Sequence, residues 1–381
     1  MHIAFITPEY PHKNLKPSAG LGSSIKNLAS VLVSKGHTIT VFVVFQNKET
    51  TFLDSDIKII SIPRKGYKVF GWYLERKYLN NKIQKEIKAS KIEVIEAPDW
   101  TGITAFMTFA IPLIIRLHGS DTYFCNLEGR KQKQKNFYLE KSALKKANKI
   151  ISVSNFTGQL TKKLFHLKNN IETIYNGINT ELFKPIDTKI SSGQILYFGT
   201  IIRKKGVLEL AEIFNIVVED YEKASLLLIG KDVKDIIENK STLNLFYERL
   251  TEKAKSKVTH LQEVPYKDIK KHIATAHVVV LPSFAEAFPM TWLETLAMEK
   301  ALVASNIGWA TELMEDEKTG YLVSPLNHDM YSNKIVTLLT DEEKNKSFGK
   351  MGRLHVISNF SPDMILKNNI NLYKSLLIKN D

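Results

Sequence analysis

The sequence has few of the features that mark secreted, membrane-spanning or metal-binding proteins. Its 381 residues include one cysteine, Cys125, so no intrachain disulfide can form and the fold does not depend on oxidation. No apolar run reaches the roughly 18 residues that a membrane helix needs. The first residues, MHIAFITPEYP, lack the basic stretch and apolar run of a signal peptide. We therefore expect a cytoplasmic protein.

Negative charge is scarce in the first half of the chain. Residues 1–180 contain 27 Lys and Arg against 13 Asp and Glu, whereas residues 181–381 contain 26 against 27. The net charge of +13 thus belongs to the first half. Such an asymmetry favours an anionic partner, namely a membrane surface, a phosphorylated lipid or a nucleic acid. A lysine-rich composition with solvated faces is the alternative.

The cations of the first half concentrate in residues 64–91 and 130–149. Aromatic residues lie among the lysines of the first segment: Tyr67, Phe70, Trp72, Tyr73 and Tyr78. This mixture suits an anionic membrane interface or glycolipid, at which the protein would be peripheral on the inner face of the cytoplasmic membrane. No signature of a nucleic-acid-binding fold is present, so no nucleic acid partner is expected.

Short apolar runs alternate with amphipathic stretches along the whole chain. This rhythm predicts parallel sheets covered by helices, and the length suits two doubly wound domains of about 180 residues each. Strands are expected at 3–7, 39–45, 94–97, 113–117, 149–154, 195–199, 225–230, 277–282 and 301–305. Helices are expected at 23–35, 207–219 and 243–255, and from Phe288 or Pro289 onward.

Turn-forming residues between 176 and 192 mark the expected linker. We therefore expect an N-terminal acceptor-binding domain over 1–180 and a C-terminal nucleotide-sugar-binding domain over 181–360. The remaining residues, 361–381, are expected to form a helix that packs back toward the N-terminal domain.

The strongest chemical signal is SFAEAFPMTWLETLAM at 283–298. Glu286 follows an apolar strand, and Pro289 is placed to open a helix, where its missing N–H costs nothing. The first-turn amides of such a helix form an anion site suited to a diphosphate. Glu294 lies further along the helix and can accept hydrogen bonds from ribose hydroxyls.

This segment resembles the Glu-x7-Glu motif of the family 4 retaining glycosyltransferases, and the resemblance continues through 300–325. The family has the α/β fold called GT-B, with two doubly wound, Rossmann-like parallel-sheet domains facing each other across a cleft. The resemblance implies that Glu286 contacts the donor sugar and that Glu294 holds the ribose. Phe288, Pro289, Met290 and Thr291 would then surround the diphosphate and sugar. Ala287 stands where the family usually has glycine.

The loop FGTIIRKKGVLEL at 198–210 joins an expected strand to an expected helix. Cations here can stabilise the charge of a departing diphosphate. By the resemblance, Lys205 matches the family's lysine before a glycine. Thr200 stands where many members have arginine, so Arg203 or Lys204 would supply the second charge.

Three features of the first half complete the expected site. Gly20 and Gly22 follow the first strand and let a ligand approach a helix start, as in the glycine-rich loop of the family. His118 follows another strand, where the family has a histidine that contacts the donor sugar. Asp99 and Trp100 end a third strand and are candidates for binding the acceptor.

The resemblance implies retention at the anomeric carbon, with Glu286, His118 and Lys205 as the catalytic residues. A hexose-type sugar would pass from a UDP- or GDP-sugar to a glycan, glycolipid or lipid-linked acceptor in surface polysaccharide or glycolipid synthesis. No His/Cys cluster with ligand spacing occurs, so neither a metal nor a further cofactor is expected. The alternatives are a sugar-nucleotide epimerase and a non-catalytic sugar- or anion-binding protein on the same scaffold.

Overall fold

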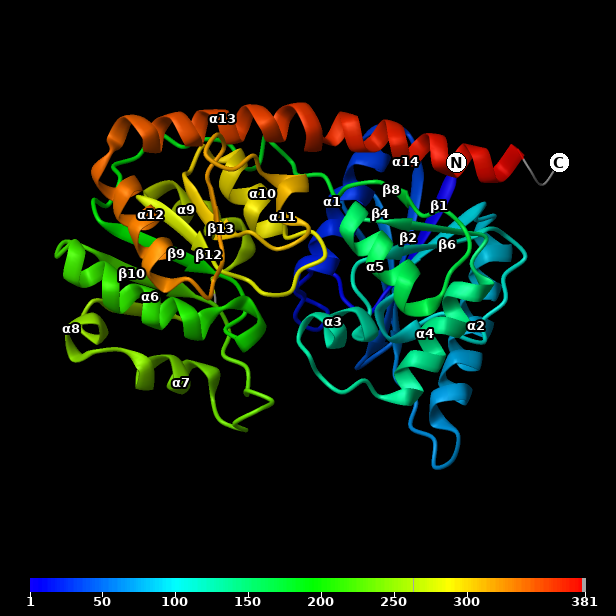
Figure 1. Ribbon diagram of the computed structural model, residues 1–381. Coiled ribbons are helices and arrows are strands. Elements are labelled where there is room, and N and C mark those ends of the chain that lie inside the picture. The colour runs from blue at the N-terminus through cyan, green and yellow to red at the C-terminus, as the bar shows by residue number, and fades with distance from the viewer. Residues whose placement is uncertain (263, 379–381) are drawn as a thin grey trace. The chain divides into compact units, whose positions relative to one another are not determined.

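The structure is a computed structural model that describes residues 1–262 and 264–378. The chain forms two compact units (Figure 1). Unit 1 contains Met1–Gly177 and the C-terminal segment from Pro362, and unit 2 is Ile178–Ser361. The first unit thus ends at Gly177, three residues before the boundary expected at residue 180.

Unit 1 is built on a sheet with the strand order β3-β4-β2-β1-β5-β6-β7-β8. All neighbouring strands are parallel except β3, which pairs antiparallel with β4. The carboxyl ends of the parallel strands therefore lie along one edge, where ligands bind in sheets of this kind. The strands are β1 (His2–Thr7), β2 (Thr38–Gln46), β3 (Thr50–Asp54), β4 (Ile57–Pro63), β5 (Val94–Pro98), β6 (Leu113–Leu117), β7 (Lys149–Ser152) and β8 (Glu172–Thr173).

Helices bury an apolar core on each face of this sheet. One core includes Leu79, Ile83 and Ile87 of α2, and the other includes Ile25 and Leu32 of α1. The helices are α1 (Gly20–Ser34), α2 (Gly71–Ser90), α3 (Asp121–Leu127), α4 (Gln134–Lys146), α5 (Asn155–Phe165) and α14 (Pro362–Leu377), with a short 3-10 turn η1 (Trp100–Gly102).

The last helix, α14, packs beside α1 (Figure 1) and is bound to the sheet by a buried polar network. Arg116 of β6 forms an ion pair with Glu96 of β5 at 2.7 Å and donates to the side-chain oxygen of Asn369 at 2.5 Å. The hydroxyl of Tyr373 donates to Glu96 at 2.9 Å. Since all four side chains are buried, each depends on the others for its hydrogen bonds.

Unit 2 contains an entirely parallel sheet with the order β11-β10-β9-β12-β13-β14. Its strands are β9 (Gln194–Phe198), β10 (Ser225–Ile229), β11 (Val258–Leu261), β12 (Val278–Leu281), β13 (Leu302–Ser305) and β14 (Tyr321–Val323). Its helices are α6 (Val207–Asp220), α7 (Thr242–Arg249), α8 (Glu252–Lys255), α9 (Tyr266–Thr275), α10 (Met290–Ala297), α11 (Ala310–Leu313), α12 (His328–Thr340) and α13 (Glu342–Phe360), with the 3-10 turn η2 (Arg203–Lys205). Strands β9, β10, β12, β13 and β14 are near-continuous apolar runs that are largely buried, as a parallel sheet requires, whereas the edge strand β11 is partly exposed.

Two expectations about helices were wrong in detail. The helix expected over 243–255 is broken into α7 and α8, because Thr251 accepts a hydrogen bond from the backbone N–H of Ala254 and caps a new helix. Pro289 is not the first residue of α10: its backbone is extended, it occupies the N-cap position, and the helix begins at Met290.

Candidate functional site

The loop after β9 is shaped by Gly206, which joins η2 to α6 with a φ of 69°. A Cβ atom at this position would collide with the carbonyl oxygen of Pro282. The backbone N–H of Phe284 donates to the carbonyl of Lys204 at 2.8 Å. The absence of a side chain at Gly206 thus allows the lysine-bearing loop to lie directly against the segment that follows β12.

This approach brings Lys205 onto Glu286. The lysine ammonium group donates to the glutamate carboxylate, and their side chains are 22% and 11% exposed. Arg203 has other partners, since it binds Asp235 at 2.8 Å and Glu238 at 2.9 Å. The structure therefore places Lys205 beside the glutamate expected to meet the sugar, whereas Arg203 is held by acidic residues of the neighbouring loop.

Helix α10 begins in the same segment. Its first residues, Met290 and Thr291, carry amides that an α-helix leaves without intrahelical acceptors, and these are suited to an anion. Phe288, just before the helix, is buried and packs edge-on against Phe360 with ring centroids 5.5 Å apart. The segment Ala287–Pro289 is thus fixed by packing, which is a condition for precise placement of a ligand.

Glu294 lies within α10, almost fully buried. Its carboxylate accepts a hydrogen bond of 2.9 Å from the hydroxyl of Tyr266 at the start of α9. Burial raises the pKa of Glu294 to about 8. A phenol hydroxyl therefore occupies one acceptor position of the carboxylate that we expect to bind ribose hydroxyls.

In unit 1, Gly20 and Gly22 lie in the first turn of α1, which begins at Gly20 and not at residue 23 as expected, and a carboxylate of the chain lies at that helix start. Glu9 accepts hydrogen bonds from the backbone N–H groups of Ala19 at 3.1 Å and Gly22 at 2.9 Å. Gly20 has open space around its Cα. The amides of Ala19 and Gly22 at the helix start where a ligand was expected are thus engaged by Glu9.

His118 and Asp99 lie together at the ends of β6 and β5. A carboxylate oxygen of Asp99 accepts from the backbone N–H of His118 at 2.9 Å. Burial raises the pKa of Asp99 to about 7. Burial, aided by the Arg116 cation, lowers the pKa of His118 to about 3, so its imidazole is neutral and can donate or accept a hydrogen bond. Trp100, the next residue, is 39% exposed.

The expected site residues therefore form two groups, one in each unit. Unit 2 contains Glu286, Glu294, Arg203, Lys204, Lys205 and residues 288–291, and unit 1 contains Gly20, Gly22, Asp99, Trp100 and His118. Two residues in contact with these groups, Glu9 and Tyr266, were not expected from the sequence. Glu9 had a detectable signal, since it is an acidic residue between a strand and a glycine-rich helix start. Tyr266 had none, because its contact with Glu294 spans 28 residues.

Two further features of residues 1–262 and 264–378 bear on the expected chemistry, namely metal-ligand clusters and membrane-spanning helices. Within these ranges, no three His, Cys, Asp or Glu side chains are grouped so that they could hold a metal ion. None of the helices in the described part of the chain combines the length and apolar character needed to cross a bilayer.

Comparison with protein families agrees with this architecture. Residues 18–182 match the family described as Glycosyltransferase Family 4, and residues 179–355 match the family described as Glycosyl transferases group 1. The mainly parallel sheet of unit 1 and the parallel sheet of unit 2, each covered by helices, together with these family matches define a GT-B glycosyltransferase. The chain belongs to glycosyltransferase family 4, which confirms the resemblance and the fold expected from the sequence.

Individual relatives are distant but similar over their whole length. A Methanocaldococcus jannaschii protein described as an uncharacterized glycosyltransferase, MJ1607, is 24% identical, and the alignment covers 98% of each chain. Among solved structures, sucrose-phosphate synthase from Thermosynechococcus elongatus has a TM-score of 0.81 at 18% identity, with 99% of each chain covered. Anabaena HepE in complex with UDP has a TM-score of 0.74 at 18% identity, covering 99% of this chain and 100% of HepE.

Proposed function

We propose that this glycosyltransferase moves a hexose-type sugar, with retention, from a UDP- or GDP-sugar to a glycan, glycolipid or lipid-linked acceptor. The observation that carries the proposal is the contact of Lys205 with Glu286 at the start of α10. A cation from one loop of unit 2 and a carboxylate from another thus lie together, close in sequence to the N-terminus of α10. That combination suits a sugar linked to a diphosphate.

Each group has a defined role in the proposed reaction. Lys205 and the amides of Met290 and Thr291 stabilise the negative charge that develops on the leaving diphosphate. Glu286 orients the donor sugar, and Glu294 accepts hydrogen bonds from the ribose hydroxyls. The neutral imidazole of His118 contributes a hydrogen bond to the sugar. The leaving diphosphate takes up the proton of the acceptor hydroxyl, and no divalent metal is required.

The binding half of the proposal is tested by a thermal-shift series with UDP, GDP and ADP. A nucleotide at 100 times its dissociation constant stabilises the folded protein by about 2.7 kcal/mol. We expect UDP or GDP to raise the melting temperature and Glu294→Gln to reduce the shift. If none of the three nucleotides stabilises the protein, the proposed donor site is wrong.

The catalytic half is tested by slow hydrolysis of the matching nucleotide sugar in the absence of an acceptor. Release of the α-anomer of the free sugar, followed by NMR before mutarotation, supports retention for an α-linked donor. A protein that binds the nucleotide but neither hydrolyses the donor nor transfers its sugar would be a non-catalytic sugar-binding protein.

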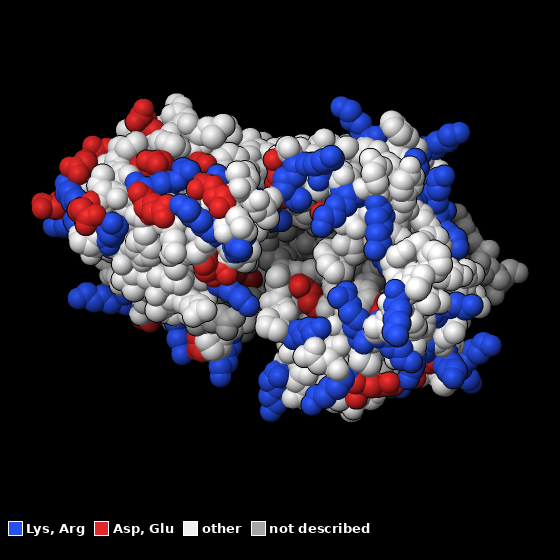
Figure 2. Space-filling view, turned by 90° about the horizontal axis from the view of Figure 1, so that it is seen from below, with Lys and Arg blue, Asp and Glu red and all other residues white. Residues whose placement is uncertain are grey.

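The basic character of unit 1 supports a further part of the proposal, namely work at an anionic membrane in surface polysaccharide or glycolipid synthesis. Figure 2 shows cations outnumbering acidic residues on the visible surface of unit 1, whereas both signs are mixed on unit 2. Segment 64–91 adds exposed aromatic side chains, among them Phe70. Sedimentation with phosphatidylglycerol vesicles at low salt tests this part, and absence of binding would contradict it.

A further inference from the structure

Five aromatic side chains on unit 1, here called the aromatic shelf, form two groups of neighbouring rings: Trp72, Tyr73 and Phe106 in one, and Phe45 and Trp100 in the other. The rings of Trp72, Tyr73 and Phe106 contact one another with centroids 5.5–6.1 Å apart. Trp100 lies 6.5 Å from Phe45. The two tryptophans, Tyr73 and Phe106 are each 38–39% exposed, so their faces are only partly covered by the fold.

The aromatic shelf lies where a parallel sheet binds its ligands. Phe45 is at the carboxyl end of β2, and Trp100 follows the carboxyl end of β5. Trp72 opens α2, which follows β4. Since these strands are parallel to one another through β1, their carboxyl ends share an edge, and this edge is the general position of ligand sites in open α/β sheets.

The backbone around the aromatic shelf is strained at several points. Phe45 and Phe106 both have a φ of 62°, and Thr101, next to Trp100, has a φ of 45°. Phe70, at the start of α2, has a φ of 50°. Large residues rarely adopt this left-handed conformation, and residues held in it gather at ligand-binding sites. At Phe45 the strain coincides with a register shift between β2 and β4.

A buried arginine fixes the aromatic shelf in place. The guanidinium group of Arg76 donates to the carbonyls of Trp72 at 3.0 Å, Thr101 at 2.9 Å and Gly102 at 3.0 Å. Arg76 is 7% exposed. It therefore joins the start of α2 to the turn η1. These backbone contacts fix the positions of Trp72 and Trp100 relative to each other in the ligand-free protein.

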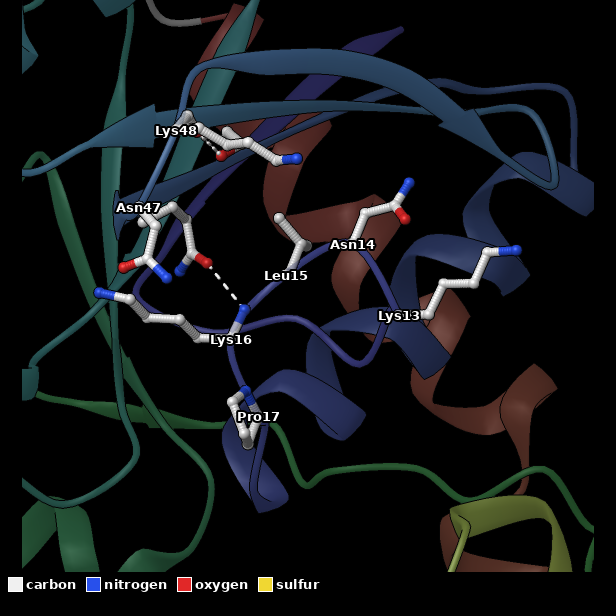
Figure 3. A pocket seen from close by; sticks show the side chains of 9 residues that line it. Lys13, Asn14, Leu15, Lys16, Pro17, Asn47 and Lys48 are labelled. Carbon is white, nitrogen blue, oxygen red and sulfur yellow. Dashed lines mark hydrogen bonds between the residues drawn. The ribbon is translucent and has the colours of Figure 1, made fainter.

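A cationic pocket adjoins the aromatic shelf. It has a volume of about 250 Å³ and is lined by the loop of residues 13–17 on one side and by Asn47 and Lys48 on the other (Figure 3). Buried Gln46 and Ser61 form its base. Lys13 extends away from the other lining residues in Figure 3. Among the residues that line the pocket, none is acidic.

Phe45 connects the pocket to the aromatic shelf. The ammonium group of Lys16 donates to the carbonyl of Phe45 at 2.5 Å, and the Arg64 guanidinium lies 5.1 Å from the centre of its ring. The carboxylates closest in sequence are otherwise engaged, since Glu49 pairs with Lys82 at 2.7 Å. Cations thus gather at one end of the aromatic shelf, and the pocket beside them has no acidic residue in its lining.

We propose that this edge binds the acceptor, and that the acceptor is an anionic glycan whose sugar carries a carboxylate or a phosphate. The apolar face of a sugar ring lies on the aromatic shelf, and the anionic group lies in the pocket with Lys16 and Lys48, while Arg64 lies over the ring of Phe45. This inference rests on the proposed function, because it names the acceptor class for the same reaction. It differs from a general membrane contact, since it requires recognition of a single charged sugar.

Intrinsic fluorescence provides a direct binding assay. Of the four tryptophans, Trp72 and Trp100 belong to the aromatic shelf, whereas Trp292 and Trp309 are fully buried in unit 2. The probes are methyl β-D-glucuronide, glucose 6-phosphate and the neutral methyl β-D-glucoside. We expect one of the anionic probes to change the emission with about tenfold higher affinity than the glucoside, since a hydrogen bond to a charged group favours the anion by that order. The preference should shrink as salt is raised.

Two pairs of variants locate the binding. Lys48→Ala should remove most of the preference for the anion, whereas Lys85→Ala, an exposed lysine further along α2, should not. Tyr73→Ala should weaken binding of anionic and neutral sugars alike, whereas Tyr138→Ala, which removes an aromatic side chain that is 65% exposed on α4, should not. All four variants keep every tryptophan reporter.

Three results would overturn the proposal. Equal affinities for the anionic and neutral probes would show that the pocket does not bind the anionic group of the sugar. Loss of sugar binding in the Lys85 or Tyr138 controls to the same extent would show that the effect is general. Absence of sugar binding together with vesicle binding that Tyr73→Ala abolishes would make this surface a membrane contact. UDP and GDP binding, measured separately, reports on the donor site in unit 2, so its loss contradicts the proposed function and not this inference.

Discussion

The ammonium group of Lys205 donates a hydrogen bond to the carboxylate of Glu286, 81 residues later in the chain. Each charge neutralises the other at the point where we propose that a diphosphate sugar binds. A diphosphate would offer Lys205 a partner of higher charge and leave Glu286 able to accept hydrogen bonds from sugar hydroxyls. The pair therefore keeps two reactive charges satisfied and in place when the donor is absent.

Replacement of Lys205 should chiefly slow the chemical step. Lys205→Ala removes a cation that stabilises the leaving diphosphate, and we expect the barrier to rise by about 2–4 kcal/mol, which corresponds to a loss of about 30- to 1000-fold in kcat. Steady-state kinetics at saturating donor measure this effect. Lys350→Ala, at an exposed position of α13, is the control. Unchanged kcat in Lys205→Ala would remove Lys205 from the mechanism.

Glu294 should make the stability of the ligand-free protein depend on pH. Burial raises its pKa from 4.5 to about 8, so between these values the folded chain keeps a proton that the unfolded chain has released. The contribution of this group to the free energy of unfolding therefore falls as the pH rises through that interval. Glu294→Gln has no such titration. The difference in melting temperature between this variant and the wild type should therefore shift in favour of the variant as the pH is raised from 5 to 8.

The same substitution separates stability from binding. Glu294→Gln replaces one of the two carboxyl oxygens by an amide nitrogen and so loses an acceptor for the ribose, and we expect the affinity for the nucleotide to fall by about 10-fold. Glu343→Gln, at an exposed position of α13, should change neither property. A melting-temperature difference between Glu294→Gln and the wild type that stays constant with pH would mean that Glu294 is ionised in the folded protein.

Removal of divalent metals should leave transfer activity intact. The proposed charge stabilisers are Lys205 and the first-turn amides of α10, which do the work that a bound cation would otherwise do. Activity is measured after dialysis against EDTA and again after addition of magnesium or manganese. A complete loss in EDTA that either ion restores would reject the metal-independent mechanism.

Removal of the single hydroxyl group of Tyr373 on α14 should destabilise unit 1. Tyr373→Phe removes the hydroxyl that donates to Glu96 at 2.9 Å and leaves a buried carboxylate with one partner fewer, at a cost of about 1–3 kcal/mol. Hydrogen exchange of the amides in β5 and β6 measures the loss within unit 1. Tyr138→Phe alters an exposed side chain and should change the free energy of unfolding by no more than about 0.5 kcal/mol. Equal protection in both variants would show that the Tyr373 hydroxyl contributes little.

The sequence predicted the features whose signals are local. Apolar runs such as ILYFG at 195–199 and HVVVLP at 277–282 correspond to β9 and β12. The Glu286–Glu294 segment indicated the correct family because its strand, loop and helix start are continuous in sequence. Helix α2 was missed although Leu79, Ile83 and Ile87 recur at a spacing of four, because the lysines of that segment were considered only as charge.

Contacts between distant residues could not be predicted in the same way. Tyr266 and Glu294, or Arg116 and Asn369, show no pattern in sequence that pairs them. The aromatic shelf is a similar case, since Phe45, Tyr73 and Phe106 come from three separate connections that only the parallel sheet brings to one edge. Trp100 was predicted to bind the acceptor. Its neighbour Phe45 was not, because it belongs to the apolar run that predicts the strand at 39–45.

The return of α14 to unit 1 has a consequence for biosynthesis. Asn369 lies 253 residues after Arg116, and Tyr373 lies 277 residues after Glu96. Unit 2, from Ile178 to Ser361, is contiguous and is translated in full between these partners. Unit 1 therefore cannot complete its core until α14 has been made, and the apolar surface that α14 will cover is until then open to chaperones.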